Sequence, residues 1–196
     1  SEAFGKGEVL FSVKSYNNNI GVPLTLFRLS PRHRVAVLEM GMNGRGEIAR
    51  LASLAGINTA VITNIGTSHI GKLKSMKNIA LAKAEIFSGA VRGGTAVLNK
   101  GSRFYSLLAE SARKAGMKVV DFGTEESAHA RVELLKTGGT GTVFSVRTGK
   151  GVAVIEMKFK GAHNVMNAAA ACLAALSLGA KLRHVKAALS RMKPGG

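Results

Sequence analysis

The stretch from Val35 to Lys83 decides the fold, because it contains two apolar runs that each end in polar residues. Val35-Ala36-Val37-Leu38 stops at Glu39, and Ala60-Val61-Ile62 stops at Thr63-Asn64, with His69 five residues further on. Continuous apolar strands are typical of parallel sheets that are covered on both faces. Such sheets bind ligands at the carboxyl ends of their strands, where Glu39, Asn64 and His69 are expected to stand. The stretch therefore predicts a site as well as a core.

Strand-like and helix-like segments alternate along the first 122 residues. Alternation of this kind predicts an α/β fold with a mainly parallel sheet flanked by helices. We expect strands at 9–13, 35–39, 60–64, 95–98 and 118–122, and helices from 22 onward and at 47–55, 75–91 and 104–115.

The pattern changes after residue 130. Three short runs at 130–134, 142–146 and 152–157 are separated by glycine-rich turns, which predicts a small antiparallel β meander. Two helices at 163–178 and 182–192 are expected to follow, with Gly179 ending the first of them.

Length and composition indicate a globular chain. Its 196 residues, 46% of them hydrophobic, suit one domain with a full core, or one domain plus a small appendage. We expect no membrane segment and a cytoplasmic location, because no apolar run approaches the roughly 20 residues of a membrane helix and no charged-then-apolar leader opens the sequence. The single cysteine, Cys172, lies among alanines and is expected to be a core residue.

The chain is strongly basic, with 28 Lys and Arg against 11 Asp and Glu and a net charge of +17. Such a charge suits nucleic acid, an acidic lipid or a phosphorylated substrate. The basic residues are scattered, however, and the 8 Phe, 2 Tyr and no Trp form no basic-aromatic ribonucleoprotein pattern. A solvated basic surface is therefore favoured, so we expect no specific nucleic-acid partner. A basic nucleic-acid-binding α/β module stays as the alternative.

Lys83 falls on the apolar side of the predicted 75–91 helix. It is four residues after Ile79 and three before Ile86, in a stripe that includes Ala82 and Ala90. Burying a lone ammonium costs several kcal/mol unless the group is paired, loses its proton or is chemically altered. The alternative is that the stem packs while the charged head reaches solvent.

Glu39 and His69 each have a plain structural interpretation, as a helix cap and as a surface histidine. Together with Lys83, at successive strand ends and on the next helix, they instead favour a divalent-metal site with oxygen and nitrogen ligands. Carboxylates with waters and phosphate oxygens suit Mg²⁺.

Five motifs match a known family, in the family's order and over almost the whole chain. They are Tyr16-Asn17-Asn18-Asn19-Ile20-Gly21-Val22-Pro23-Leu24-Thr25-Leu26, Glu39-Met40-Gly41-Met42-Asn43 with Gly46-Glu47-Ile48, Ile62-Thr63-Asn64-Ile65-Gly66-Thr67-Ser68-His69, Ala82-Lys83-Ala84-Glu85-Ile86-Phe87 and Gly161-Ala162-His163-Asn164-Val165-Met166-Asn167-Ala168. With these motifs the chain resembles the central, ATP-binding domain of the Mur ligases of peptidoglycan synthesis, which has a P-loop NTPase-like fold.

The resemblance implies a role for each matched residue. Glu39 and His69 match Mg²⁺ ligands, and Lys83 matches a lysine that is carbamylated in the family; these three are also the candidate catalytic residues. Further matches are Asn164, Asn167 and His163 with the adenine-binding stretch, and Asn17, Asn18, Thr63 and Asn64 with substrate-binding segments.

The first two motifs are most similar to the family members that add D-Ala-D-Ala to UDP-N-acetylmuramoyl-tripeptide. The implied reaction is ATP-driven amide formation through an acyl phosphate, with ATP and Mg²⁺ as cofactors. Another Mur-type ligase, such as a folylpolyglutamate-type enzyme, remains the alternative within the family, although the segment from Asn17 to Leu24 disfavours it.

Two parts of the family pattern are not found. The family's phosphate-binding loop, Gly-x-x-Gly-Lys-Thr-Thr, precedes the first matched strand, and Gly5-Lys6-Gly7 does not replace it because no strand precedes it and no hydroxyl residue follows. The sequence ends at Gly196, about where the family enters its C-terminal domain. We therefore expect residues 1–196 to form a central ATP-binding domain that lacks both parts and is inactive alone.

Overall fold

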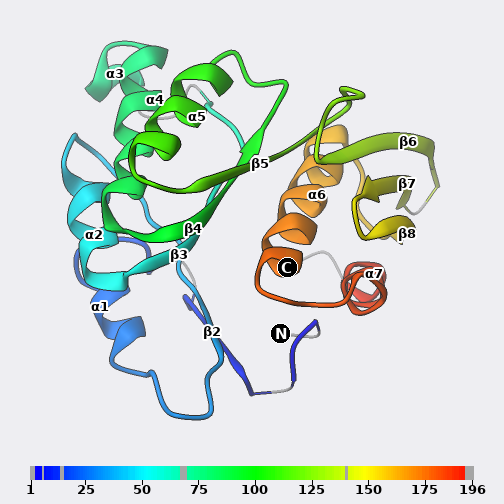
Figure 1. Ribbon diagram of the computed structural model, residues 1–196, viewed down its shortest axis with the longest axis horizontal. Helices are drawn as coiled ribbons and strands as arrows, with labels where there is room; N and C mark the ends of the chain where they lie inside the picture. Colours follow the sequence, from blue (N-terminus) through cyan, green and yellow to red (C-terminus); the bar gives the residue numbers. More distant parts are fainter. Residues whose placement is uncertain (1–2, 6, 14–15, 67–69, 140, 193–196) are drawn as a thin grey trace.

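A computed structural model describes residues 3–5, 7–13, 16–66, 70–139 and 141–192 (Figure 1). Its main sheet has six strands in the order β3-β4-β5-β6-β7-β8. The strands from β3 to β6 pair in parallel, and β6 to β8 pair antiparallel. The predicted parallel sheet and meander are thus confirmed, as parts of one continuous sheet. The strands are β3 (Ile57–Ile62), β4 (Ala90–Asn99), β5 (Lys118–Gly123), β6 (Ala130–Gly138), β7 (Gly141–Thr148) and β8 (Gly151–Met157).

Helices cover both faces of the parallel strands, as parallel sheets require (Figure 1). On one face, α2 (Glu47–Ala55), α4 (Met76–Ala84) and α5 (Tyr105–Lys114) enclose a core that includes Ile79 and Leu98. On the other face, α6 (Ala162–Ser177) and α7 (Leu182–Arg191) enclose a second core around Phe122 and Phe144. Alternate residues of β4 and β5 therefore enter different cores.

Most helix boundaries agree with the sequence to within a residue or two. The helix α2 occupies the predicted residues, and Gly179, in the left-handed region at φ +87°, separates α6 from α7. The helix α1 (Gly21–Leu26) begins close to the predicted Val22-Pro23. The short helix α3 (Ile70–Leu73) was not predicted.

The predicted 75–91 helix is too long. The helix α4 ends at Ala84, the 3₁₀ helix η1 (Glu85–Gly89) follows, and β4 begins at Ala90. Tertiary contacts explain the change, because the Glu85 carboxylate accepts hydrogen bonds from the backbone N–H groups of Gly46 (2.8 Å) and Ala49 (3.4 Å) at the start of α2. Ionic capping of a neighbouring helix by Glu85 fixes the chain where the periodicity alone would continue α4.

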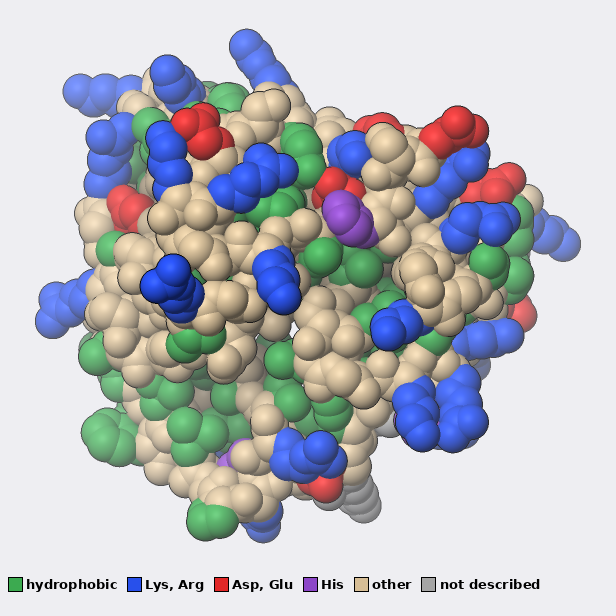
Figure 2. All heavy atoms as spheres, in the orientation of Figure 1, with side chains coloured by type: hydrophobic (Ala, Val, Ile, Leu, Met, Phe, Trp, Pro, Cys, Tyr) green, Lys and Arg blue, Asp and Glu red, His purple; other side chains and the backbone are tan. Residues whose placement is uncertain are grey.

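The strand β2 (Val35–Val37) is less covered than its sequence predicts. Among the described residues it pairs only with β1 (Val9–Phe11), in a separate two-stranded parallel sheet, and Val37 is 55% exposed. In the described part of the chain, β2 is therefore not covered on both faces. Figure 2 shows hydrophobic side chains gathered on the part of the surface where Figure 1 places α1 and β2.

Two expectations from composition can be compared with the fold. Cys172 is fully buried, and burial raises the pKa of its thiol to about 11, as expected for a core residue. Among the described residues, no helix combines the length and apolar character needed to cross a membrane.

Gly89 permits the close contact between η1 and α2, so Gly89→Ala should destabilise the protein. A Cβ atom at this position would lie 2.2 Å from the backbone oxygen of Ala52. We expect a loss of about 1–3 kcal/mol in the free energy of unfolding, measured by urea denaturation, because overpacking against backbone cannot relax easily. Gly149→Ala is the matched control, since a Cβ there meets nothing within 4 Å. Equal midpoints and slopes for the two variants would contradict this account of η1.

Candidate functional site

Glu39 stands just past the carboxyl end of β2 with its carboxylate held from one side. The side-chain amide of Asn17 donates a hydrogen bond to Glu39 Oε1 at 2.8 Å. The backbone N–H of Glu39 donates to the Ser12 hydroxyl at 3.3 Å. The residue is otherwise exposed, as the strand-end prediction requires.

Thr63 and Asn64 follow β3, and their backbone oxygens meet two other elements. Lys83, in the last turn of α4, donates from Nζ to the Asn64 carbonyl at 3.1 Å. Asn99, at the end of β4, donates from Nδ2 to the Thr63 carbonyl at 3.2 Å. Lys83 is half-buried, and this burial lowers the pKa of its ammonium group. The ammonium is thus desolvated with a neutral carbonyl as its hydrogen-bond acceptor.

An open cavity of about 510 Å³ separates β2 from β3. Glu39, Thr63 and Lys83 line it at the carboxyl ends of the two strands. Most of its remaining wall is apolar, from β2, β3, Ile86 and the end of α6. The structure therefore brings Glu39 and Lys83 to one cavity. Asn64, the residue after Thr63, is joined to Lys83 through its backbone carbonyl.

The other predicted residues have separate positions. His69 lies outside the described residues. The Asn18 side chain accepts from the backbone N–H groups of Ile20 (3.0 Å) and Gly21 (2.9 Å), so it holds the turn into α1.

The three adenine candidates are on the first turns of α6. His163 and Asn167 are exposed, and Asn164 donates from Nδ2 to the Lys160 carbonyl at 2.8 Å. Ala174 and Leu178, at the other end of α6, line the cavity together with Ile57 at the start of β3. The C-terminal half of α6 therefore reaches this cavity, whereas the three candidates are not among the residues that line it.

Sequence comparison places this arrangement in a family. The profile of the Mur ligase middle domain matches residues 2–175. The chain belongs to this family. It is 34% identical over 188 residues to the UDP-N-acetylmuramoyl-tripeptide--D-alanyl-D-alanine ligase of Escherichia coli (strain K12), covering 95% of this chain and 41% of the relative.

Solved structures show the same fold. MurF from Acinetobacter baumannii superposes with a TM-score of 0.87 at 30% identity, over 95% of this chain and 40% of that one. MurF from Thermotoga maritima, solved in complex with ADP, gives a TM-score of 0.79 at 19% identity over 96% of this chain and 43% of that one. This Mur ligase middle domain thus spans about two fifths of the length of these relatives.

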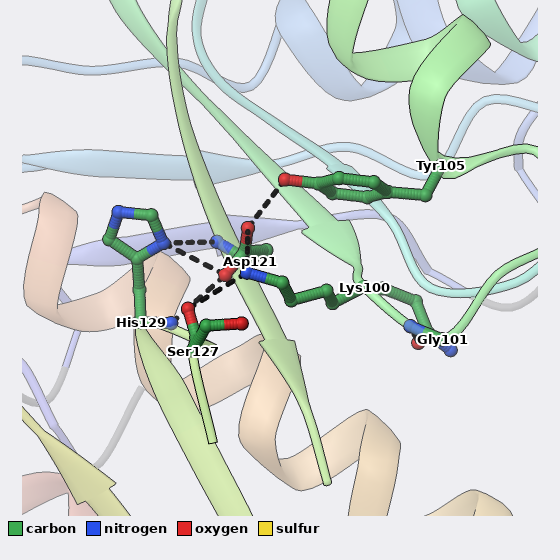
Figure 3. A network of polar contacts seen from close by, with 7 residues as sticks. Lys100, Gly101, Tyr105, Asp121, Ser127 and His129 are labelled. Atoms are coloured by element: carbon green, nitrogen blue, oxygen red, sulfur yellow. Dashed lines mark hydrogen bonds and ion pairs between the residues drawn. The ribbon is translucent and has the colours of Figure 1, made fainter. Parts of the chain in front are cut away.

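A second polar cluster in this Mur ligase domain was missed by the sequence analysis (Figure 3). Asp121 of β5 is buried, with its side chain 2% exposed. It accepts hydrogen bonds from the Tyr105 hydroxyl (2.5 Å) and the backbone N–H of His129 (2.9 Å), and its Oδ1 lies 2.8 Å from His129 Nδ1. Lys100 Nζ is 3.6 Å from Asp121 Oδ2 and donates to the Ser127 carbonyl at 2.8 Å. The cluster ties β4, α5 and β5 to the start of β6.

Opposing effects set the acidity of this cluster. Burial alone would raise the pKa of Asp121, but hydrogen bonds from Tyr105 and His129 keep it below its ordinary value. Its contribution to stability is therefore present above the unfolded pKa of 3.8 and is lost as pH falls through the lower folded pKa. The available sequence signal was an aspartate inside an apolar strand, Lys118–Gly123, which has to be paired if both faces are covered.

Tyr105→Phe tests the alkaline side of the cluster. Burial, followed by the hydrogen bond to Asp121, raises the pKa of Tyr105 to about 12 from 10.0. The neutral hydroxyl should stabilise the native state by about 1–3 kcal/mol, the usual range for a hydrogen bond to a charged group. This difference between wild type and variant should be constant below pH 10 and shrink as pH rises toward 12, measured by urea unfolding. A difference that grows over this interval would contradict the assignment.

Proposed function

We propose that this chain is the central, ATP-binding domain of a ligase that joins D-Ala-D-Ala to UDP-N-acetylmuramoyl-tripeptide. In this reaction the terminal carboxylate of the tripeptide takes the γ-phosphoryl group of ATP, and the amine of D-Ala-D-Ala displaces phosphate. The match to relatives with this named activity over 95% of the chain carries the proposal. The convergence of Glu39 and Lys83 on one cavity at a parallel sheet edge supports it.

Among the described residues, Glu39 offers an oxygen ligand of the kind that a magnesium ion prefers at this edge. Glu39 Oε1 is hydrogen-bonded to Asn17, which leaves an exposed carboxylate with further acceptor capacity for a hard cation. Among the described residues no group of three His, Cys, Asp or Glu side chains could hold a metal, so the protein ligands would have to include Lys83 as a carbamate and His69. Magnesium would supply positive charge to the phosphoryl group.

Lys83 has the chemical setting that carbamate formation requires. Only the neutral amine adds to carbon dioxide, and burial lowers the pKa of this amine. The reaction turns a half-buried cation into an anion, which then has a use beside a divalent ion. The hydrogen bond from Nζ to the Asn64 carbonyl holds the amine near the end of β3, on the cavity that Glu39 lines.

The cavity between β2 and β3 offers a place for the phosphate-binding loop that the family has upstream. In the described part of the chain, β2 pairs only with β1, and β3 only with β4, so each has an open edge. Val37 is exposed although its sequence suits a covered strand. A further parallel strand between these edges would cover β2 and end beside Glu39 and Lys83. The adenine of ATP would then bind to α6, through Asn164, Asn167 and His163.

The isolated chain should fold without catalysing the reaction. We expect an ATP dissociation constant weaker than roughly 1 mM by calorimetry with Mg²⁺, since the backbone amides and lysine of a phosphate-binding loop are missing. A chimera in which these 196 residues replace the matching segment of the Escherichia coli relative should release phosphate only with both substrates present.

The isolated chain also tests the alternative function, that of a basic nucleic-acid-binding module. Basic side chains are spread over the face in Figure 2, so duplex DNA should bind the isolated chain weakly, without sequence preference and with a steep loss on adding salt. Tight sequence-selective DNA binding at physiological salt would contradict the proposal, whereas micromolar ATP affinity of the isolated chain would show that the phosphate site is misplaced.

Lys83→Ala should nearly abolish phosphate release in the chimera, with partial rescue by a small carboxylic acid that replaces the carbamate. Incubation of the chimera that retains Lys83 with ¹³C-labelled bicarbonate should give a carbamate carbon signal that the Lys83→Ala variant lacks. Lys77→Ala is the matched control, because Lys77 is an exposed lysine on the same helix. Wild-type turnover by Lys83→Ala would rule out the carbamate role.

A further inference from the structure

We infer that Asn17 is a positioning residue that orients the Glu39 carboxylate toward a divalent cation, rather than a residue that binds substrate through its side chain. The inference rests on the proposed function, because it concerns the same metal site. Its basis is the 2.8 Å hydrogen bond from Asn17 Nδ2 to Glu39 Oε1, between residues 22 positions apart in the sequence. A side-chain contact across this separation has to be built by the fold.

The backbone on both sides of this contact is fixed. The N–H of Gly41 donates to the Asn17 carbonyl at 2.7 Å, so the loop before α1 is bonded to the segment after β2. On the Glu39 side, the N–H bond to the Ser12 hydroxyl ties the residue to the segment after β1. The two residues are therefore held at their backbones as well as joined at their side chains.

Two glycines make room for the contact. A Cβ atom on Gly41 would lie 3.0–3.1 Å from the Cγ, Nδ2 and Oδ1 atoms of Asn17. A Cβ atom on Gly21 would lie 2.5 Å from the Cα atom of Tyr16, which shows how tightly the loop folds back before α1. The adjacent Asn18 caps this turn through its own side chain. Asn17 is thus presented to Glu39 by a closely packed loop.

An amide suits this position for an electrostatic reason. An uncharged donor fixes one carboxylate oxygen and leaves the full negative charge of Glu39 available to a cation. A lysine or arginine in its place would neutralise that charge. Groups that hydrogen-bond to a metal ligand orient it, and their loss commonly costs about 10–100-fold in metal affinity. The Asn17 side chain would act on the metal through Glu39 without touching it.

Manganese provides a paramagnetic probe for the 196-residue chain itself. In ¹⁵N-labelled wild type, Mn²⁺ should broaden the backbone amide signals of Glu39 and Met40 selectively, and excess Mg²⁺ should reverse the broadening. Asn17→Ala should weaken this selective broadening by roughly 10–100-fold in Mn²⁺ concentration. Gly41→Ala should weaken it in the same direction, because the new methyl group displaces the Asn17 side chain without removing it. Thermal unfolding by circular dichroism reports whether each variant stays folded.

Asn58→Ala is the matched control, because Asn58 is an exposed asparagine at the start of β3, the end of that strand away from Thr63. It should titrate like wild type. If wild type and both test variants bind Mn²⁺ equally at Glu39, the positioning role is wrong while the metal site stands. If wild type shows no selective broadening at Glu39 that Mg²⁺ reverses, the proposed metal site fails and the inference fails with it.

Discussion

Parallel pairing of β3 to β6 is the constraint on which the rest of the structure depends. Parallel neighbours in a sheet are joined by crossovers, and here the crossovers from β3 to β4 and from β4 to β5 place α4 and α5 on one face and bring the carboxyl ends of these strands to one edge. Thr63 follows β3, Asn99 closes β4, and Asp121 lies two residues before the end of β5. The site is therefore a product of topology, since residues far apart in sequence meet because their strands end together.

The same constraint explains what could be read from the sequence. Apolar runs that stop at polar residues predict where strands end, so the sequence alone identifies Glu39, Thr63 and Asn64 as residues that follow β2 and β3. Helix α2 was also placed correctly, because its periodicity is uninterrupted and Gly56 closes it in the left-handed region at φ +61°. Adenine and substrate roles follow from family resemblance, whereas a metal site at Glu39, His69 and Lys83 is also predicted by the positions of these residues in the sequence.

Other features depend on contacts that periodicity does not encode. The end of α4 is set by Glu85, whose carboxylate caps a helix 36–39 residues earlier in the chain. Exposure of β2 follows from which strands are available to pair with it, and its own residues carry no sign of this. The pairing of Asp121 is also not encoded by periodicity. Its partners Tyr105 and His129 belong to other parts of the chain, at spacings that no helix or strand repeat predicts.

Asp121 and Lys83 show two ways in which one sheet edge accommodates a desolvated ionisable group. Asp121 has hydrogen-bond donors from two elements and a nearby ammonium, so its charge is satisfied and its pKa stays low. For Lys83 the hydrogen-bond acceptor is a neutral carbonyl, and desolvation lowers its pKa. A compensated charge stabilises a fold, whereas a destabilised ammonium gives up its proton more readily and becomes a better nucleophile. This difference in compensation places Asp121 in the scaffold, and it is the physical reason for the proposal that Lys83 takes part in the chemistry.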